Sequence, residues 1–219
     1  MARPKIKRNS TNIDMTAMCD VAFLLLSFFI LTTKFKPAEA VPITPPSSVS
    51  AQVAPSKDVC LINITKDGKV FIAIDDEGKR SGVLNTLNTT RNLGLSSGEM
   101  AALAKQPFFG SALAQLKQVA TMPADKLTGD VLPGIPCKDS TNNEMIDWMR
   151  AVNSTYQGQT LNLLMKGDNT SKYPAFSNVI KALKKNDFLK FQMVTNPESV
   201  PAGTELYNKA MQGIKQADL

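Results

Sequence analysis

The chain of 219 residues contains no histidine, only three cysteines and a single long apolar run. Without histidine, Ser-His-Asp and Cys-His catalytic arrangements and every histidine-containing zinc site are excluded. The cysteines are too dispersed for a C-x-x-C motif, and no G-x-G-x-x-G or G-x-x-x-x-G-K sequence is present to bind phosphate. We therefore expect a protein that is not an enzyme and that has no cofactor and no metal ion.

The part of the chain after the apolar run offers two weaker candidates for a site. Asp75, Asp76 and Glu77 could attract a cation, although acidic residues directly after a predicted strand are more typical of a solvated turn. Cys60 and Cys137 could form a disulfide if this part of the chain lies outside the cytoplasm. Two cysteines alone do not establish a disulfide framework, so both the bonded and the free state remain open.

The apolar run, from Met15 to Thr33, contains an aspartate, Asp20. At about 1.5 Å per residue, a helix of about 19 residues spans roughly 28 Å, so residues 15–34 are predicted to cross a membrane. A charged aspartate there costs at least about 2.5 kcal/mol on insertion scales and normally faces protein or a wet cavity. Asp20 is therefore the leading functional candidate, as a residue that takes up and releases protons.

Helical spacing places two further polar residues, Thr16 and Ser27, on the same side as Asp20, within roughly 60° of arc. The rest of the helix surface is apolar. Because one helix cannot cover its own aspartate, a partner must supply polar surroundings, which predicts oligomerisation within the membrane. The alternative is that Asp20, near the start of the run, extends to the interface and only helps to anchor the chain.

Basic residues are concentrated before the apolar run, which predicts that residues 1–14 are a cytoplasmic tail. Four precede the run and two follow it: Arg3, Lys5, Lys7 and Arg8, then Lys34 and Lys36. The cluster is short and has no interleaved aromatic residues, so nucleic-acid binding is not expected. A cleaved signal peptide, with Ala38-Glu39-Ala40 as its small-residue pattern, is a rival interpretation, which Asp20 and the crowded cleavage region disfavour.

The rest of the chain is predicted as an α+β domain, residues 59–219, after an extended linker, residues 35–58, which is rich in proline and serine. An Asp-Gly turn indicates an opening hairpin, and a later strand, helix and strand suggest parallel pairing in a mixed sheet. The predicted strands are 59–65, 69–74, 160–166 and 189–195, and the predicted helices are 97–119 (interrupted at 107–110), 142–153, 173–186 and 204–216.

Several segments in the same order resemble the ExbD/TolR family, the small subunits of proton-driven motors in the bacterial inner membrane. Residues 13–20, IDMTAMCD, are similar to the family's I-N-x-T-P-x-x-D motif, with Asp14 in place of asparagine and Ala17 in place of proline. Val41 and Pro42 are similar to the start of its V-x-L-P-like linker segment. Residues 161–195 resemble its strand ending in aspartate, helix and final strand, whereas residues from about 77 to 140 form an insertion.

The resemblance implies a homodimer in the pore of an ExbB-like pentameric ring, with the proton-motive force driving alternate protonation and release of Asp20. It also implies a single-pass inner-membrane protein with a periplasmic domain of the ExbD/TolR type, which passes motion to a TonB-like protein for outer-membrane transport. The TolR branch implies the Tol-Pal envelope system instead. A signal-anchored periplasmic binding domain is the alternative from another class, and a flagellar stator is less favoured because no peptidoglycan-binding domain is recognised.

Overall fold

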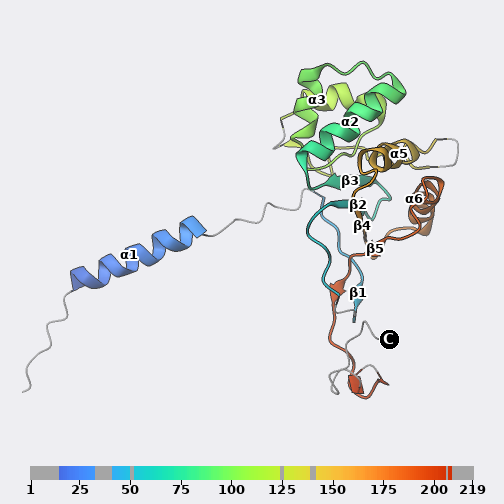
Figure 1. Cartoon of the computed structure of the whole chain (residues 1–219). Helices are drawn as coiled ribbons and strands as arrows, with labels where there is room; N and C mark the ends of the chain where they lie inside the picture. Colours follow the sequence, from blue (N-terminus) through green and yellow to red (C-terminus); the bar gives the residue numbers. More distant parts are fainter. Residues whose placement is uncertain are drawn as a thin grey trace, which may run out of the picture. The chain divides into compact units, whose positions relative to one another are not determined.

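The computed structural model of the chain describes residues 15–32, 41–49, 52–123, 126–138, 142–205 and 207–208. Contacts divide the chain into two compact units, one up to Ala38 and one from Glu39 onward. The first unit contributes helix α1, and the second contributes a mixed α+β domain (Figure 1). The α+β class predicted from the sequence is confirmed for the second unit.

Helix α1 (Met15–Thr32) contains no glycine or proline and consists mainly of large apolar residues. Its large apolar side chains from Met15 to Leu31 are all exposed, by 54% to 86%. Among the described residues, no helix combines the length and the apolar content needed to cross a membrane. Thr33 and Lys34, the end of the span predicted over 15–34, lie outside the described residues.

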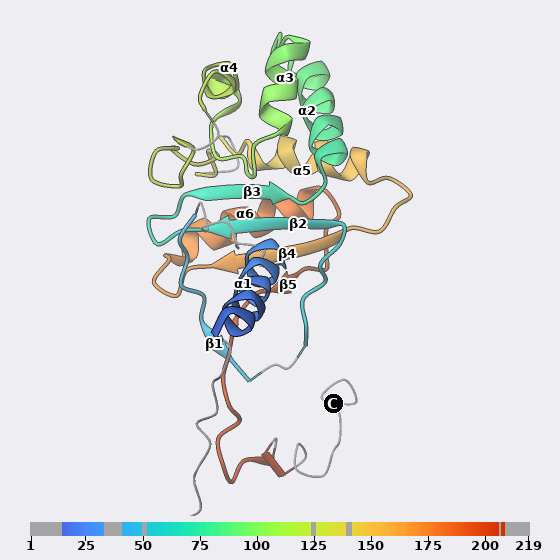
Figure 2. The ribbon, with the colours of Figure 1, turned by 90° about the vertical axis from the view of Figure 1, so that its left-hand side faces the viewer.

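The second unit is built on a four-stranded sheet in the order β3-β2-β4-β5 (Figure 2). Strand β2 pairs antiparallel with β3 and parallel with β4, and β4 pairs parallel with β5. The predicted hairpin and the parallel pairing around a crossover helix are therefore confirmed. The strands are β2 (Val59–Ile64), β3 (Val70–Ile74), β4 (Asn162–Gly167) and β5 (Gln192–Met193).

Two amphipathic helices, α5 (Met145–Thr155) and α6 (Tyr173–Lys185), lie against one face of this sheet (Figures 1 and 2). Both were predicted, within a few residues of their observed ends. Alternate residues of β2 point into the interface with these helices and are completely buried, because one face of a strand carries every second side chain. The core includes Cys60, Ile62 and Ile64 of β2, Trp148 and Met149 of α5, and Val179 and Leu183 of α6.

The segment expected to be an insertion, residues from about 77 to 140 and called the insertion below, forms a group of helices beyond the β3 edge of the sheet (Figure 2). These are α2 (Glu77–Arg91), α3 (Ser97–Ala104), the 3-10 helix η1 (Leu113–Gln115) and α4 (Leu116–Ala120). The helical segment predicted over 97–119 is confirmed, but its interruption is longer than the predicted 107–110, since it extends from Lys105 to Ala112. Helix α2 was not predicted. Asp76, assigned to a solvated turn, caps this helix, since its carboxylate accepts a hydrogen bond of 2.7 Å from the Lys79 amide.

The insertion shares the core of the domain and also covers one edge of its sheet. Phe109 and Ile72 of β3 exchange two backbone hydrogen bonds of 2.7 and 2.9 Å, which satisfy part of the outer edge of β3. The Phe109 ring packs against Trp148 of α5 with its centroid 4.9 Å from that of the indole. Residues 77–120 are thus joined to the sheet and to α5 through a single hydrophobic core.

Residues 41–49, which were predicted as part of the extended linker, are extended and run along the domain. Strand β1 (Ser47–Ser48) pairs in parallel with β6 (Asn196–Pro197) in a separate two-stranded sheet. The Asn196 amide donates to the Pro46 carbonyl at 2.9 Å. The predicted last strand, 189–195, is shorter than expected, and most of the predicted helix 204–216 lies outside the described residues.

Candidate functional site

Three polar residues of α1 form the first candidate site, and the helix is continuous through all of them. Thr16 precedes Asp20 by one turn and Ser27 follows it by two turns, so their side chains share one face of the helix. Asp20 is exposed and is the only charged residue of α1. The Ser27 hydroxyl donates to the Leu24 carbonyl at 2.9 Å, which leaves its oxygen able to accept a hydrogen bond.

The linker residues Val41 and Pro42 belong to the second unit and have opposite exposures. Val41 is 6% exposed and Ile43 is 9% exposed, whereas Pro42 between them is exposed. A methyl group added at Gly129 would lie 3.2 Å from a Val41 methyl, so this part of the insertion closely approaches the linker segment. The alternation is that of an extended segment with one side packed on the domain.

Asp168, directly after β4, also holds this segment. Its carboxylate accepts hydrogen bonds from the Thr44 amide at 3.1 Å and from the amide and hydroxyl of Thr170 at 2.9 and 2.6 Å. The Asn169 amide donates to the Thr44 carbonyl at 2.9 Å. Because these bonds favour the ionised form, with the Thr170 hydroxyl contributing most, the pKa of Asp168 is lowered below its ordinary value.

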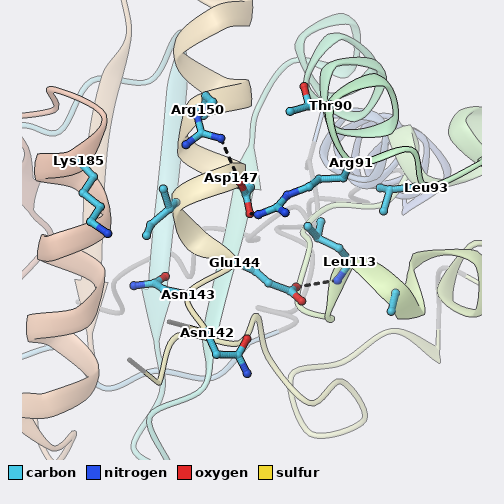
Figure 3. Close-up of a pocket in the computed structure, with 12 residues that line it drawn as sticks. Thr90, Arg91, Leu93, Leu113, Asn142, Asn143, Glu144, Asp147, Arg150 and Lys185 are labelled. Atoms are coloured by element: carbon cyan, nitrogen blue, oxygen red, sulfur yellow. Dashed lines mark hydrogen bonds and ion pairs between the residues drawn. The ribbon is translucent and has the colours of Figure 1, made fainter. Parts of the chain in front are cut away.

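A second candidate site is an open groove of about 870 Å³ between the insertion and the helices of the domain (Figure 3). Asp147 of α5, only 5% exposed, accepts hydrogen bonds from Arg91 of α2 and, at 3.2 Å, from Arg150 of α5. The bond to Asp147 raises the pKa of Arg91. Glu144 accepts a hydrogen bond of 2.7 Å from the Leu113 amide at the start of η1.

Sequence reasoning did not find this groove, because its charged residues come from three helices that are distant in sequence. Lys185 of α6 completes the set of cations around it (Figure 3). A partial signal was present, since Asp147 and Arg150 are three residues apart on a predicted helix and can interact there. Nothing in the sequence indicated that Arg91 reaches the same carboxylate.

The two weaker candidates for a site take on structural roles. Cys60 is buried in β2, Cys137 is partly buried in a loop and both are free, so the disulfide considered between them is not formed. Asp75 accepts a hydrogen bond of 3.2 Å from the Val59 amide and Asp76 caps α2. Within the part of the chain that the structure describes, no group of three or more acidic or cysteine side chains is arranged to hold a metal ion.

The pattern of the family described as biopolymer transport protein ExbD/TolR matches residues 6–198 of this chain. The chain belongs to the ExbD/TolR family. No curated protein and no solved structure matches it. The match includes Asp20, the linker residues Val41 and Pro42, and Asp168, and it extends across the insertion. In this ExbD/TolR chain, the groove lies where α5 and α6 meet α2, a helix of the segment that we expected to be an insertion.

Proposed function

We propose that this chain is the proton-carrying subunit of an inner-membrane motor of the ExbB-ExbD type. In this proposal it uses the proton-motive force to energise a TonB-like protein for active transport across the outer membrane. The supporting observation is α1, where exposed apolar side chains surround a helix whose only charged residue is Asp20. Membership of a biopolymer transport family agrees with this role.

The proposed topology follows from what such a helix requires. Residues 15–34 cross the membrane, residues 1–14 lie in the cytoplasm, and the rest of the chain lies in the periplasm. A helix that is apolar apart from one polar face needs mainly apolar surroundings, whereas the carboxylate on that face needs a polar neighbour. Both needs are met if two copies of α1 lie side by side within the pore of an ExbB-like pentameric ring.

In the proposed mechanism Asp20 binds a proton from one side of the membrane and releases it to the other. Each proton that crosses about 100 mV delivers roughly 2.3 kcal/mol, which neutralisation of one side chain can convert into motion of its helix. Thr16, one turn before Asp20, and Ser27, two turns after it, lie on the same face of the helix. The linker with Val41 and Pro42 then passes the motion to the periplasmic domain.

The test is TonB-dependent uptake in cells that produce only the Asp20→Asn variant, which has nearly the same shape but cannot ionise. We expect uptake to be lost, with normal protein level by immunoblot and normal co-purification of the ring subunit. Asp20→Glu, which can still ionise, should retain part of the activity. Asp130→Asn is the matched control because it neutralises an exposed aspartate of the domain, and it should leave uptake unchanged.

Normal uptake with Asp20→Asn would overturn the proposal that Asp20 carries protons for this transport. Sensitivity of the envelope to detergent is measured in the same cells. Envelope defects without a loss of uptake would assign the chain to the TolR-like branch and its Tol-Pal system instead. Unchanged phenotypes in both assays would favour a signal-anchored periplasmic binding domain, in which α1 serves only as the anchor.

A further inference from the structure

The groove between the insertion and the domain has cations on three of its walls. Arg91 comes from α2 of the insertion, Arg150 from α5 and Lys185 from α6 (Figure 3). The side chains of Arg91 and Arg150 are 50% and 56% exposed, although both contact the same buried carboxylate. Lys185 is exposed as well, so all three cations are accessible to a molecule that enters the groove.

The acidic side chains of the groove are already occupied by internal contacts. Asp147 accepts hydrogen bonds from the guanidinium groups of Arg91 and Arg150, and Glu144 accepts one from the Leu113 amide. Each guanidinium has five N–H donors, and a carboxylate can satisfy only some of the donors of two such groups. Three cations against two carboxylates leave the groove with a net positive charge and with donors that face solvent.

The groove is also lined by apolar side chains, including those of Leu93, Leu113 and Ile146. Its volume of about 870 Å³ is far larger than one carboxylate or phosphate ion requires, and lies within the usual range for pockets that enclose a ligand. Cations beside apolar side chains suit a chain that carries both acidic and apolar groups.

We propose that this groove binds an acidic peptide segment of a partner protein. Carboxylates of the segment pair with Arg91, Arg150 and Lys185, since guanidinium groups bind carboxylates through two parallel hydrogen bonds. Apolar residues of the segment pack on Leu93 and Ile146, which line the groove and are partly exposed. The insertion thereby adds a docking site to the periplasmic domain, and this site does not depend on proton transfer through Asp20.

The binding test uses the full chain, purified in detergent, and a fluorescein-labelled heptapeptide of alternating glutamate and leucine. A second peptide carries glutamine in place of every glutamate. We expect saturable binding of the glutamate peptide by fluorescence anisotropy, at least about tenfold tighter than the glutamine peptide, and weaker binding as salt concentration rises. No binding of the acidic peptide, or equal binding of both peptides, would overturn the proposal.

Substitutions locate the binding site. Lys185→Gln and Arg150→Gln should each weaken binding of the glutamate peptide at least about fivefold. Lys184→Gln is the matched control, because Lys184 is an exposed neighbour on α6 that does not line the groove. This variant should bind the glutamate peptide as tightly as the wild type does. Asp20→Asn should also bind normally, which separates this proposal from the proposed proton transfer. Equal losses with Lys184→Gln and Lys185→Gln would show nonspecific attraction and would refute the site.

Discussion

The amide of Thr44 donates a hydrogen bond of 3.1 Å to the carboxylate of Asp168, 124 residues further along the chain. This contact joins the segment that carries Val41 and Pro42 to the end of β4. The reciprocal bond from the Asn169 amide to the Thr44 carbonyl makes the connection two-sided. The carboxylate that follows the central strand β4 thus fixes the position of the linker segment around Thr44 on the domain.

Replacement of Asp168 by asparagine should loosen this segment without unfolding the sheet. A net hydrogen bond is worth about 0.5 to 1.5 kcal/mol, so hydrogen exchange of the Thr44 amide should become about 2- to 12-fold faster. Hydrogen-exchange mass spectrometry of a peptide that covers residues 41–49 measures this effect. Asp187→Asn is the control, since that aspartate is exposed and remote from the contact in sequence. Unchanged exchange in Asp168→Asn would contradict a structural role for the carboxylate.

The contribution of Asp168 should also depend on pH in a defined direction. Its pKa is lower in the folded protein than its ordinary value of 3.8, so the unfolded state binds a proton more readily. The stabilisation is therefore complete above about pH 4 to 5 and is lost as the pH falls through the folded pKa, below 3.8. The free energies of unfolding of the wild type and Asp168→Asn, measured in urea, should become equal only in this acidic range. A constant difference between them at all pH values would exclude the ionised carboxylate as the cause.

Gly110 permits the close approach of the insertion to β3. A methyl group at this position would lie 2.0 Å from a ring carbon of Phe71, which is completely buried. Gly110→Ala should therefore lower the free energy of unfolding by about 1 to 3 kcal/mol or more, because the packed ring cannot move freely. Gly98 in α3 is the matched control, since a methyl group there meets nothing within 4 Å. Thermal unfolding that ranks the two variants equally would contradict this account.

The elements that could be predicted are those with strong local signals. The Asp-Gly turn indicated the hairpin of β2 and β3, and the spacing of apolar residues indicated α5 and α6. Helix α2 escaped prediction because its sequence contains many glycine, serine, asparagine and threonine residues, which have low helix propensity. It is stabilised by the Asp76 cap and by burial of Val83, Leu84 and Leu87, and that burial is set by tertiary contacts.

The groove and the β1–β6 pair were beyond sequence reasoning for a related reason. Arg91 and Asp147 are 56 residues apart in the sequence. Strands β1 and β6 are short and lie near opposite ends of the sequence of the second unit, although they pair in space. Neither pairing has a local pattern, because each depends on where the whole domain brings two segments together. The polar face of α1 was predictable because Thr16, Asp20 and Ser27 lie within a single helix.

The ion pair between Arg91 and Asp147 should contribute to attachment of the insertion. A double-mutant cycle with Arg91→Gln and Asp147→Asn, followed by urea unfolding, measures the interaction without the other effects of each substitution. Because Asp147 is nearly buried while Arg91 is half exposed, we expect a coupling energy of about 0.5 to 2 kcal/mol. Coupling near zero would show that the pair adds no stability. Arg150→Gln with Asp147→Asn gives the comparison pair on the same carboxylate.

The free state of Cys60 and Cys137 leads to a prediction about thiol reactivity. Burial raises the pKa of Cys60 to about 12 and that of Cys137 to about 11, so at pH 8 very little of either is thiolate. In a Cys19→Ser background, Ellman's reagent should therefore react slowly with Cys137 and with Cys60 only after unfolding. In denaturant without a reductant, Ellman's reagent should titrate two thiols per chain. A titration of no thiols would show that Cys60 and Cys137 form a disulfide. A Cys137→Ser variant isolates Cys60, whose reaction rate should then follow the rate at which the core opens, since the strand that carries it lies beneath α5 and α6.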